Sequence, residues 1–411
     1  MKKTASILTA LLLCFLLAVP AAALEAQDPA APEGAAPSAV LIERQTGTVL
    51  YAKNETERRP PASVTKVMTL LLIAEAVDSG ELALDDMVTA SERAASMGGS
   101  QIWLEVGEQL SVSDMIKCVA VVSANDCAVA LAEHLCGSEA AFVERMNQKA
   151  EELGCENTNF KDPTGISAND HYTTPEDMVR MCRYAMSFDQ FREAVSYPDG
   201  EVPASNVRDE GFTYETTNFV MFPDDRYESP YARYMTGIKT GWTPAAGYCF
   251  SGCMEKDGLV FYSVAMGGEE LMYKDGQRIV QGDFLDTIEL YTLTDGLRAE
   301  GPDTTPEDMA VTSILGAGTF HVKLPDGANI LVQNGQTVTA EYDIPSTVFG
   351  PVSEGDTVGT VTLKAGDTEK TVDLVAASSR GISPLIIGGA AAIVATAAVI
   401  ILKMSKRKNN V

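Results

Sequence analysis

A serine and a lysine stand three residues apart in the stretch Pro60-Pro61-Ala62-Ser63-Val64-Thr65-Lys66, where the residue pattern predicts the start of a helix. Residues three apart share one helix face, so the Ser63 hydroxyl and the Lys66 amine can meet. An unprotonated amine can activate a serine as a nucleophile. Burial and a second nearby cation favour the unprotonated form, so the hypothesis requires another lysine. The spacing alone is a weak signal, because Ser405 and Lys408 repeat it in the basic tail.

Two further triplets could complete such a site. Ser123-Ala124-Asn125 separates an apolar run from a helical one, which predicts a junction between helices with its polar groups facing a cleft. A second Ser-Ala-Asn, at 167–169, follows Thr164-Gly165 and is typical of a turn. Lys239-Thr240-Gly241 precedes strand-like residues after a short turn. Lys239 would supply the second cation, Thr240 a hydroxyl for a carboxylate, and Gly241 a close backbone approach for substrate.

The elements that must position these motifs are both helices and strands. Two short β-rich runs around Gln45-Thr46-Gly47 predict a hairpin over 38–51. Helix-compatible residues fill 108–153, and Thr174-Pro175 opens another helix. The remaining expectations are strands at 248–254 and 260–266, a helix at 279–292, and a polar, irregular stretch at 187–234. The fold class is therefore predicted to be α+β, with this domain spanning 37–300.

The character of the chain changes beyond Gly301-Pro302. Several segments alternate apolar and polar residues between Gly, Asp and Pro turns, which predicts a small all-β domain over 305–380. Nothing in this domain suggests catalysis, and we expect it to hold the first domain away from a membrane.

Both ends of the chain look like targeting segments. Residues 1–23 have the pattern of a secretory signal peptide, with cleavage after Ala23 as the first choice, and 24–36 is an Ala/Pro-rich flexible leader. The uncharged segment 385–402 would span roughly 27 Å as a helix, close to a hydrocarbon core. A basic tail, 403–411, follows it, so we expect a cytoplasmic tail and an extracellular catalytic domain on a single-pass protein of the cell membrane.

The charge balance excludes a class of partner. The 411 residues carry a formal charge of -26, and the six basic residues in 1–23 and 403–411 leave -26 - 6 = -32 for the stretch between. This strongly negative charge argues against a nucleic-acid partner, which would require a basic surface.

Cysteines and histidines give no sign of a disulfide framework or a metal site. The seven cysteines after the signal peptide are scattered through helical-looking segments, so we expect mostly buried thiols. His134, His171 and His321 are isolated in sequence, which argues against a zinc peptidase and predicts structural roles. No metal or other cofactor is expected.

The motifs together resemble a known family. A closely similar trio occurs in penicillin-binding proteins and class A β-lactamases, and the Glu-x-x-Leu-Asn string expected of the latter is absent. From Ala36 to about Leu290 the chain is similar to the low-molecular-mass penicillin-binding D-alanyl-D-alanine carboxypeptidases, whose architecture also includes a β domain and a membrane-anchored end. Further matching stretches are Ser123-Ala124-Asn125-Asp126, His171-Tyr172-Thr173-Thr174, Gly237-Ile238-Lys239-Thr240-Gly241 and Ala246-Gly247-Tyr248-Cys249. The implied fold is penicillin-binding, β-lactamase-like, with an antiparallel sheet and helices.

The resemblance implies roles in catalysis. Ser63 would attack the carbonyl of a terminal D-Ala-D-Ala peptide of a peptidoglycan stem, with Lys66 as base, and Ser123 would relay a proton to the departing D-alanine. Water would then hydrolyse the acyl-enzyme. β-Lactam antibiotics would acylate the same serine and act as covalent inhibitors.

It also implies roles in substrate binding. Asn125 would hold the substrate amide, and Lys239 and Thr240 would bind the terminal carboxylate. The backbone amides of Ser63 and Trp242 would form an oxyanion hole. Trp242, which follows Gly241, would also narrow substrate choice.

One departure from the family concerns the substrate carboxylate. Many members carry an arginine after the Gly-Gly that follows the next strand, whereas here Gly267-Gly268 is followed by Glu269-Glu270, and Arg278 comes later. Which cation completes the carboxylate site is left open. Two alternatives also stay open, an endopeptidase acting on cross-linked peptidoglycan and an inactive relative that binds peptidoglycan.

Overall fold

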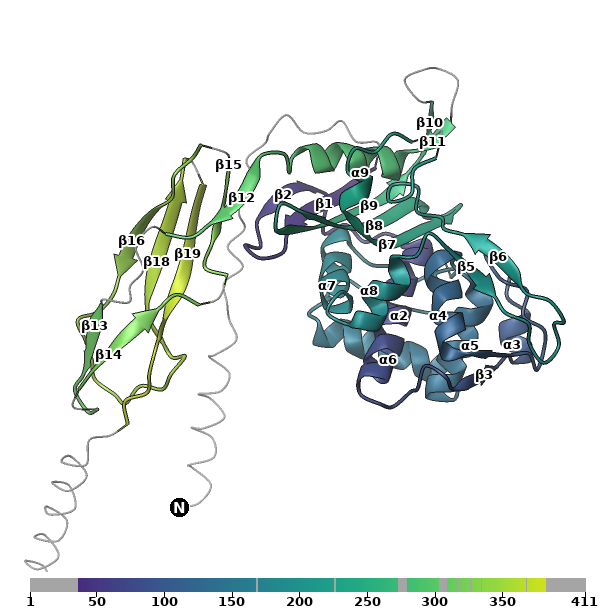
Figure 1. Ribbon diagram of the computed structural model, residues 1–411, viewed down its shortest axis with the longest axis horizontal. Coiled ribbons are helices and arrows are strands. Elements are labelled where there is room, and N and C mark those ends of the chain that lie inside the picture. The colour runs from purple at the N-terminus through teal and green to yellow at the C-terminus, as the bar shows by residue number, and fades with distance from the viewer. Residues whose placement is uncertain are drawn as a thin grey trace, which may run out of the picture.

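The computed structural model of this chain describes residues 36–381, except 168, 225–226, 273–278, 303–308, 317, 326, 334 and 367. Figure 1 shows a part built from helices and a sheet, which holds the predicted motifs, beside an all-β part formed by the C-terminal strands. The predictions of an α+β first domain and of an all-β unit after it are confirmed.

A five-stranded antiparallel sheet forms the centre of the first part, in the order β2-β1-β9-β8-β7. The N-terminal hairpin joins the sheet through β1, where Ala39 lies opposite Ala265 of β9. Strand β7 is at the edge and pairs on one side only, with Lys239 opposite Ser251 of β8. The strands are β1 (Ser38–Glu43), β2 (Val49–Lys53), β7 (Met235–Thr243), β8 (Gly247–Lys256) and β9 (Leu259–Gly268).

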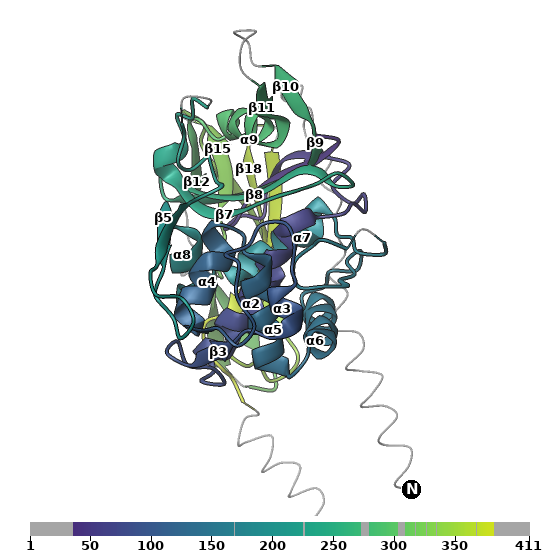
Figure 2. The same ribbon diagram turned by 90° about the vertical axis from the view of Figure 1, so that its right-hand side faces the viewer.

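Helices cover both faces of this sheet. Figures 1 and 2 show α9 over one face and a cluster of helices against the other, and each interface contains its own apolar core. The helices are α2 (Lys66–Asp78), α3 (Glu92–Ala95), α4 (Val112–Val121), α5 (Asn125–Cys136), α6 (Glu139–Glu152), α7 (Pro175–Ala185), α8 (Asp189–Val195) and α9 (Gly282–Thr292), with the short 3-10 turns η1 (Ala62–Thr65) and η2 (Ala232–Tyr234).

Helix α2 lies at the middle of the larger core. Its residues from Val67 to Ala74, all apolar except Thr69, are buried on every side, as expected for a helix without a polar face. Several of the surrounding helices begin at side-chain caps that satisfy a free amide, such as Ser138 before α6 and Thr174 before α7. The first residues of α2 are therefore held in a fixed position relative to the sheet.

Three short ribbons were not anticipated. They are β3 (Met87–Thr89) with β4 (Gln109–Ser111), β5 (Asp199–Val202) with β6 (Phe212–Glu215), and β10 (Glu270–Met272) with β11 (Ile279–Gln281). The stretch 187–234, predicted as irregular, thus contains α8, β5, β6 and η2, and the helix predicted from 279 begins at Gly282. Short polar strands carry little periodic signal, which explains these errors.

The C-terminal part is joined to the first by β12 (Leu297–Glu300), which pairs with β15 (Ile330–Gln333). Its six-stranded sheet has the order β16-β18-β19-β14-β13-β17. Two small clusters, around Val361 and Leu374 and around Val311 and Phe320, form its core. The strands are β13 (Ala310–Ser313), β14 (Gly318–Lys323), β16 (Thr339–Asp343), β17 (Thr347–Val348), β18 (Thr357–Ala365) and β19 (Thr368–Ala376).

The burial of the cysteines agrees with the prediction of mostly buried thiols. The seven cysteines from Cys118 to Cys253 are free thiols, all buried except the partly exposed Cys136.

Within the described part of 36–381, no helix has the length and apolar character needed to cross a bilayer. The predicted signal peptide, 1–23, and the predicted span, 385–402, lie outside the described residues.

Candidate active site

Ser63 and Lys66 lie together where η1 passes into α2. The Lys66 amine is 2.8 Å from the Ser63 hydroxyl oxygen, within hydrogen-bond distance. The same amine donates a second hydrogen bond, of 3.1 Å, to the carbonyl of Thr164. One N–H of the amine is directed at that carbonyl. The other hydrogen-bonding positions of the nitrogen can therefore face Ser63.

The surroundings of Lys66 favour its neutral form. Its side chain is fully buried, and burial lowers its pKa well below the usual value of a lysine; the nearby Lys239 lowers the pKa further. Asp162 and Asp126 act in the opposite direction without reversing the shift. A buried neutral amine beside a serine hydroxyl can take the hydroxyl proton, as a general base must.

Lys239 is the second buried lysine of the site. It lies on β7, and burial lowers its pKa to about 7. Its amine donates to the carbonyl of Thr240 at 3.0 Å. The predicted short turn and strand-like residues follow Lys239-Thr240-Gly241 as β8, and the triplet itself lies inside β7. The strand, rather than a turn, presents them to the start of α2.

Gly241 allows β7 to approach the start of α2 closely. A Cβ at this position would stand 2.8 Å from the backbone nitrogen of Ser63 and 2.9 Å from that of Val64. Any side chain would therefore push the strand away from the serine. This contact brings the backbone of Gly241 and Trp242 to the same corner as the Ser63 amide.

Ser123 and Asn125 lie at the junction between α4 and α5, as their flanking patterns predict. Ser123 has a left-handed backbone, with φ of 65°. Its hydroxyl and the Asn125 carbonyl oxygen are buried and have no hydrogen-bond partner among the described residues. The Asn125 side-chain amide donates to the carbonyl of Gly98 at 2.7 Å. Two unpaired oxygens thus remain available to a substrate.

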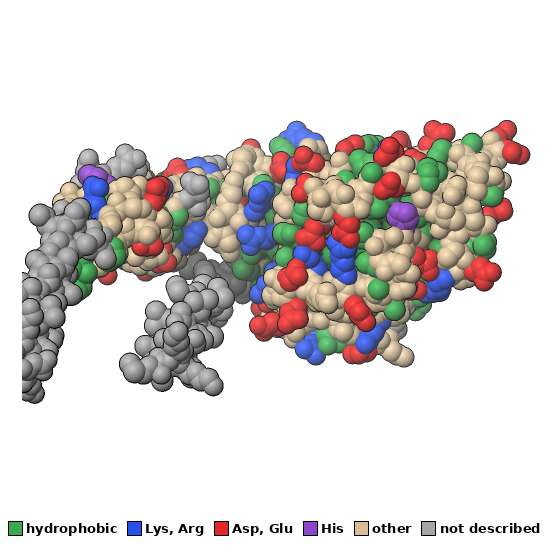
Figure 3. Space-filling view, turned by 90° about the horizontal axis from the view of Figure 1, so that it is seen from below, with side chains coloured by type: hydrophobic (Ala, Val, Ile, Leu, Met, Phe, Trp, Pro, Cys, Tyr) green, Lys and Arg blue, Asp and Glu red, His purple; other side chains and the backbone are tan. Residues whose placement is uncertain are grey.

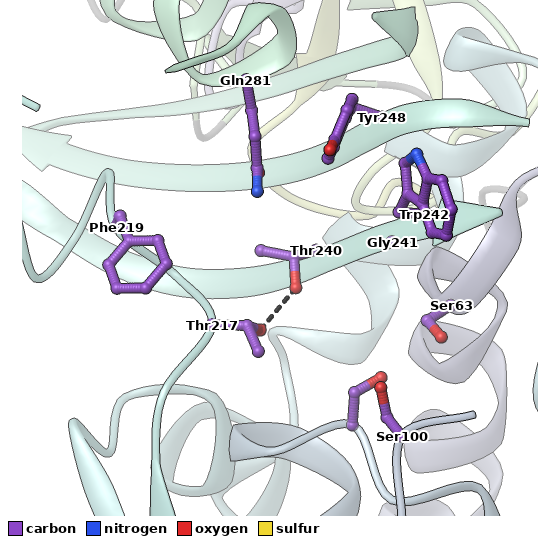
Figure 4. A pocket seen from close by; sticks show the side chains of 10 residues that line it. Ser63, Ser100, Thr217, Phe219, Thr240, Gly241, Trp242, Tyr248 and Gln281 are labelled. Atoms are coloured by element: carbon purple, nitrogen blue, oxygen red, sulfur yellow. Dashed lines mark hydrogen bonds between the residues drawn. The ribbon is translucent and has the colours of Figure 1, made fainter. Parts of the chain in front are cut away.

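Two cavities meet at Ser63. One, of about 230 Å³, is lined by Ser123 and by residues from β7, β8 and the segment before β7. Figure 4 shows Thr240 pointing toward Thr217, with Gln281, Tyr248 and Trp242 around them and Ser63 at one side. The other, of about 650 Å³, is lined by Asn125, by 96–100 and by 162–167. The arrangement fits a ligand that extends to both sides of the serine hydroxyl.

The turn Asp162-Pro163-Thr164-Gly165 supports the base. The Asp162 carboxylate accepts hydrogen bonds from the amides of Thr164 and Gly165, both at 2.7 Å, and of Ser167, at 2.8 Å. Burial acts to raise its pKa, but the hydrogen bonds from Ser167 and Thr164 outweigh burial and lower it. Asp162 therefore stays ionised and fixes the carbonyl of Thr164 against Lys66.

His171 is a buried structural residue, as its isolation in sequence predicts. Its Nδ1 accepts from the amide of Lys161 at 3.1 Å, so the proton is on Nε2, which lies 2.8 Å from the Thr65 hydroxyl. Burial lowers its pKa, which favours this neutral form. Among the described residues, no group of three or more His, Cys, Asp or Glu could hold a metal ion.

Sequence reasoning missed several lining residues. Thr217 contacts the Thr240 hydroxyl at 2.5 Å, and Ser100, Phe219 and Gln281 line the same cavity. These residues come from segments far apart in the chain, and none belongs to a short motif with a chemical meaning. Only tertiary structure brings them to the serine.

Glu270, the second acid after Gly267-Gly268, has a partner in the structure. The Tyr248 hydroxyl donates to Glu270 at 2.7 Å, and burial followed by this hydrogen bond raises the pKa of Tyr248 to about 12. Tyr248 lines the smaller cavity. The position where many family members have an arginine is thus followed by an acid that orients a phenol at the cavity wall.

The chain matches a known protein family over most of its first domain. Residues 25–270 match the model of the family described as D-alanyl-D-alanine carboxypeptidase. This chain belongs to that family. The carboxypeptidase match contains every predicted site residue, from Ser63 to Trp242.

Individual relatives agree with the family assignment. The D-alanyl-D-alanine carboxypeptidase DacF of Bacillus subtilis is 35% identical over 80% of this chain and 81% of its own length. A D-alanyl-D-alanine endopeptidase of Pseudomonas aeruginosa is 30% identical over 54% of this chain and 67% of its own. Among solved structures, penicillin binding protein 5 from Haemophilus influenzae has a TM-score of 0.72 at 25% identity, covering 85% of this chain and 98% of that one.

Proposed function

We propose that this chain is a serine-type carboxypeptidase that removes the terminal D-alanine from peptidoglycan stem pentapeptides through an acyl-enzyme. The observation that carries the proposal is the 2.8 Å contact between the Ser63 hydroxyl and a fully buried Lys66 amine, at the point where two cavities meet. Family membership supports the same reaction.

The substrate would bind as an extended peptide along β7. This strand is at the edge of the sheet, so its outer backbone groups can pair with a peptide. The Asn125 carbonyl oxygen, which has no partner among the described residues, would accept from a substrate amide. The hydroxyls of Thr240 and Thr217 and the amine of Lys239 would hold the terminal carboxylate.

Acylation would begin with transfer of the Ser63 proton to Lys66. The Ser63 oxygen attacks the carbonyl carbon of the penultimate D-alanine, and the amides of Ser63 and Trp242 stabilise the negative charge on the carbonyl oxygen. The C–N bond then breaks, and the departing amine takes a proton through Ser123, whose buried hydroxyl is unpaired in the described structure. Water hydrolyses the ester and returns the proton to Ser63.

Fluorescent penicillin tests this proposal directly. We expect covalent labelling of the wild type, no labelling of Ser63→Ala, and release of one D-alanine per pentapeptide. A folded wild-type protein that is not labelled would leave only a peptidoglycan-binding role. Release of peptides from cross-linked dimers, without D-alanine release from pentapeptide, would instead identify an endopeptidase.

We also propose that 1–23 directs export, that 385–402 spans the membrane, and that 403–411 stays in the cytoplasm. The support is the sequence pattern: a basic start and apolar run at one end, and an uncharged run followed by four basic residues at the other. Protease added to intact spheroplasts should degrade the catalytic domain and leave an epitope at the C-terminus protected.

A further inference from the structure

The C-terminal part has an exposed apolar end. Ile314 and Phe349 are 51% and 72% exposed, and Leu315 and Val348 beside them are partly exposed. Ile314 and Leu315 follow β13, and Phe349 follows β17, so the parallel pairing of these strands brings the two loops to one edge. We call these four residues the apolar tip. It lies at the end of this part that carries the loop between β13 and β14 (lower left in Figure 1).

The tip is a defined structure rather than two loose loops. The amides of Ile314 and Leu315 donate to the carbonyls of Val348 and Phe349, at 2.9 and 3.1 Å. The Ser313 hydroxyl donates to the carbonyl of Gly350 at 2.9 Å. Since these bonds hold both loops, the exposure of the apolar side chains is fixed by the fold.

The chain leaves the described structure at this same place. Arg380, one residue before its end, forms an antiparallel bridge with Val352, and the Arg380 side chain donates to the carbonyl of Thr319 at 2.6 Å. Three residues separate Gly381 from Leu385, where the uncharged segment begins. Four steps along the chain reach at most about 14 Å. The tip must therefore lie near the start of that segment, whatever conformation the connecting residues take.

The charge of the tip differs from that of the rest of the protein. The loop sequences 314–318 and 348–352 contain no acidic or basic residue, in a chain with a formal charge of -26. Arg380 lies beside them through its bond to Thr319, and Glu354 follows two residues after the second loop, where its amide donates to the Ser379 hydroxyl. Charged groups resist transfer into a less polar medium, whereas an uncharged apolar surface enters it readily. The headgroup layer extends roughly 5–8 Å beyond the hydrocarbon on each side.

From these observations we infer that the apolar tip rests in the lipid interface and fixes the C-terminal part upright on the membrane. The inference rests on the proposed membrane span at 385–402. Phe349 and Ile314 would enter the headgroup layer next to the point where the chain enters the bilayer. The catalytic part, attached through β12 and β15 at the other end, would then stand at a set height above the membrane.

Single-tryptophan variants of the full chain can test this contact. In a background with Trp103→Phe and Trp242→Phe, Phe349→Trp places the probe at the tip. Thr337→Trp is the matched control, because it is exposed at the opposite end, beside the turn between β18 and β19. Both variants are reconstituted in vesicles of phosphatidylcholine and phosphatidylglycerol with brominated acyl chains, after circular dichroism shows that they fold. We expect at least twofold stronger quenching at 349 than at 337.

The outcomes separate the tip from the anchor. If the protein does not float with the vesicles, the proposed span has failed. If it floats but the two probes are quenched equally, the span stands and the tip inference is overturned. If the probe at 349 is shielded from iodide without being quenched by bromine, a protein partner such as a second copy covers the tip, and the lipid inference is again wrong.

Discussion

At the scale of single residues, the site depends on two lysines whose ammonium groups lose a proton unusually easily. Lys66 and Lys239 lie fully buried, and their pKa values are lowered mainly by desolvation. Burial lowers the pKa of both lysines, but the proposed reaction requires them in opposite charge states. Lys66 must be neutral to accept a proton, whereas Lys239 must be charged to attract a carboxylate.

Replacement of Lys66 by arginine tests the neutral base. An arginine would carry a permanent positive charge at this site and cannot accept the serine proton, so the Lys66→Arg variant should acylate on the order of 100-fold or more slowly. The second-order rate of labelling with fluorescent penicillin measures the effect. Lys364→Arg, at an exposed lysine of β18 paired with Glu341, is the control and should label at the wild-type rate. Rapid labelling of Lys66→Arg would contradict the assignment of the base.

The pH profile tests Lys239. As pH rises through about 7, Lys239 loses its charge in the free enzyme, so affinity for the substrate carboxylate should fall and kcat/KM should decline. In Lys239→Arg the charge persists at all accessible pH values, and the decline should move to higher pH even if the overall rate drops. An alkaline limb at the same pH in both proteins would show that another group is responsible.

At the scale of secondary-structure elements, a turn from outside the helix sets the position of the catalytic pair. The segment 162–165 lies against η1, and its carbonyl at Thr164 binds Lys66. Gly165 permits this contact, because a Cβ there would stand 1.8 Å from the carbonyl oxygen of Ala62.

Gly165→Ala should therefore displace the turn and reduce penicillin acylation by about 100-fold, the typical effect of a misplacement near 1 Å. Gly154→Ala is a matched control. It has a similar left-handed φ, +72° against +84°, and a Cβ added there would have no other atom within 4 Å. Both variants should lose stability from left-handed backbone strain, Gly165→Ala should lose more because its Cβ meets the Ala62 carbonyl, and only Gly165→Ala should lose acylation rate. Equal rates in the two variants would show that the turn does not position the base.

How well each feature of the site could be predicted depends on whether its contacts join residues that are close together in the sequence. The Ser63–Lys66 contact depends on helix geometry over three residues, so sequence spacing predicts it. The strand that follows Lys239-Thr240-Gly241 was predicted, but the place of the triplet inside an edge strand was not, because Gly241 suits a tightly packed strand as well as a turn. Thr217 and Gln281 reach the cavity only through the packing of β7 against distant segments, for which local patterns give no signal.

At the scale of the whole molecule, the net charge of the protein has the same sign as the charge of its proposed substrate. The chain carries a formal charge of -26, and Figure 3 shows acidic side chains spread over the face of the catalytic part seen from below. The two site lysines are buried. Arg93, which lines the larger cavity, is paired with Glu139 at 2.8 Å. Long-range repulsion of an anionic peptide is therefore not offset by these cations.

Salt should consequently accelerate the reaction with anionic substrates. Between 10 and 150 mM salt the screening length falls from about 30 to about 8 Å, so we expect kcat/KM for a stem pentapeptide to rise about two- to fivefold, with little change in kcat. A matched pentapeptide with its side-chain carboxylates amidated should respond less, because it is repelled less. A rate that falls with salt would mean that a local positive field at the cavity mouth dominates over the net charge.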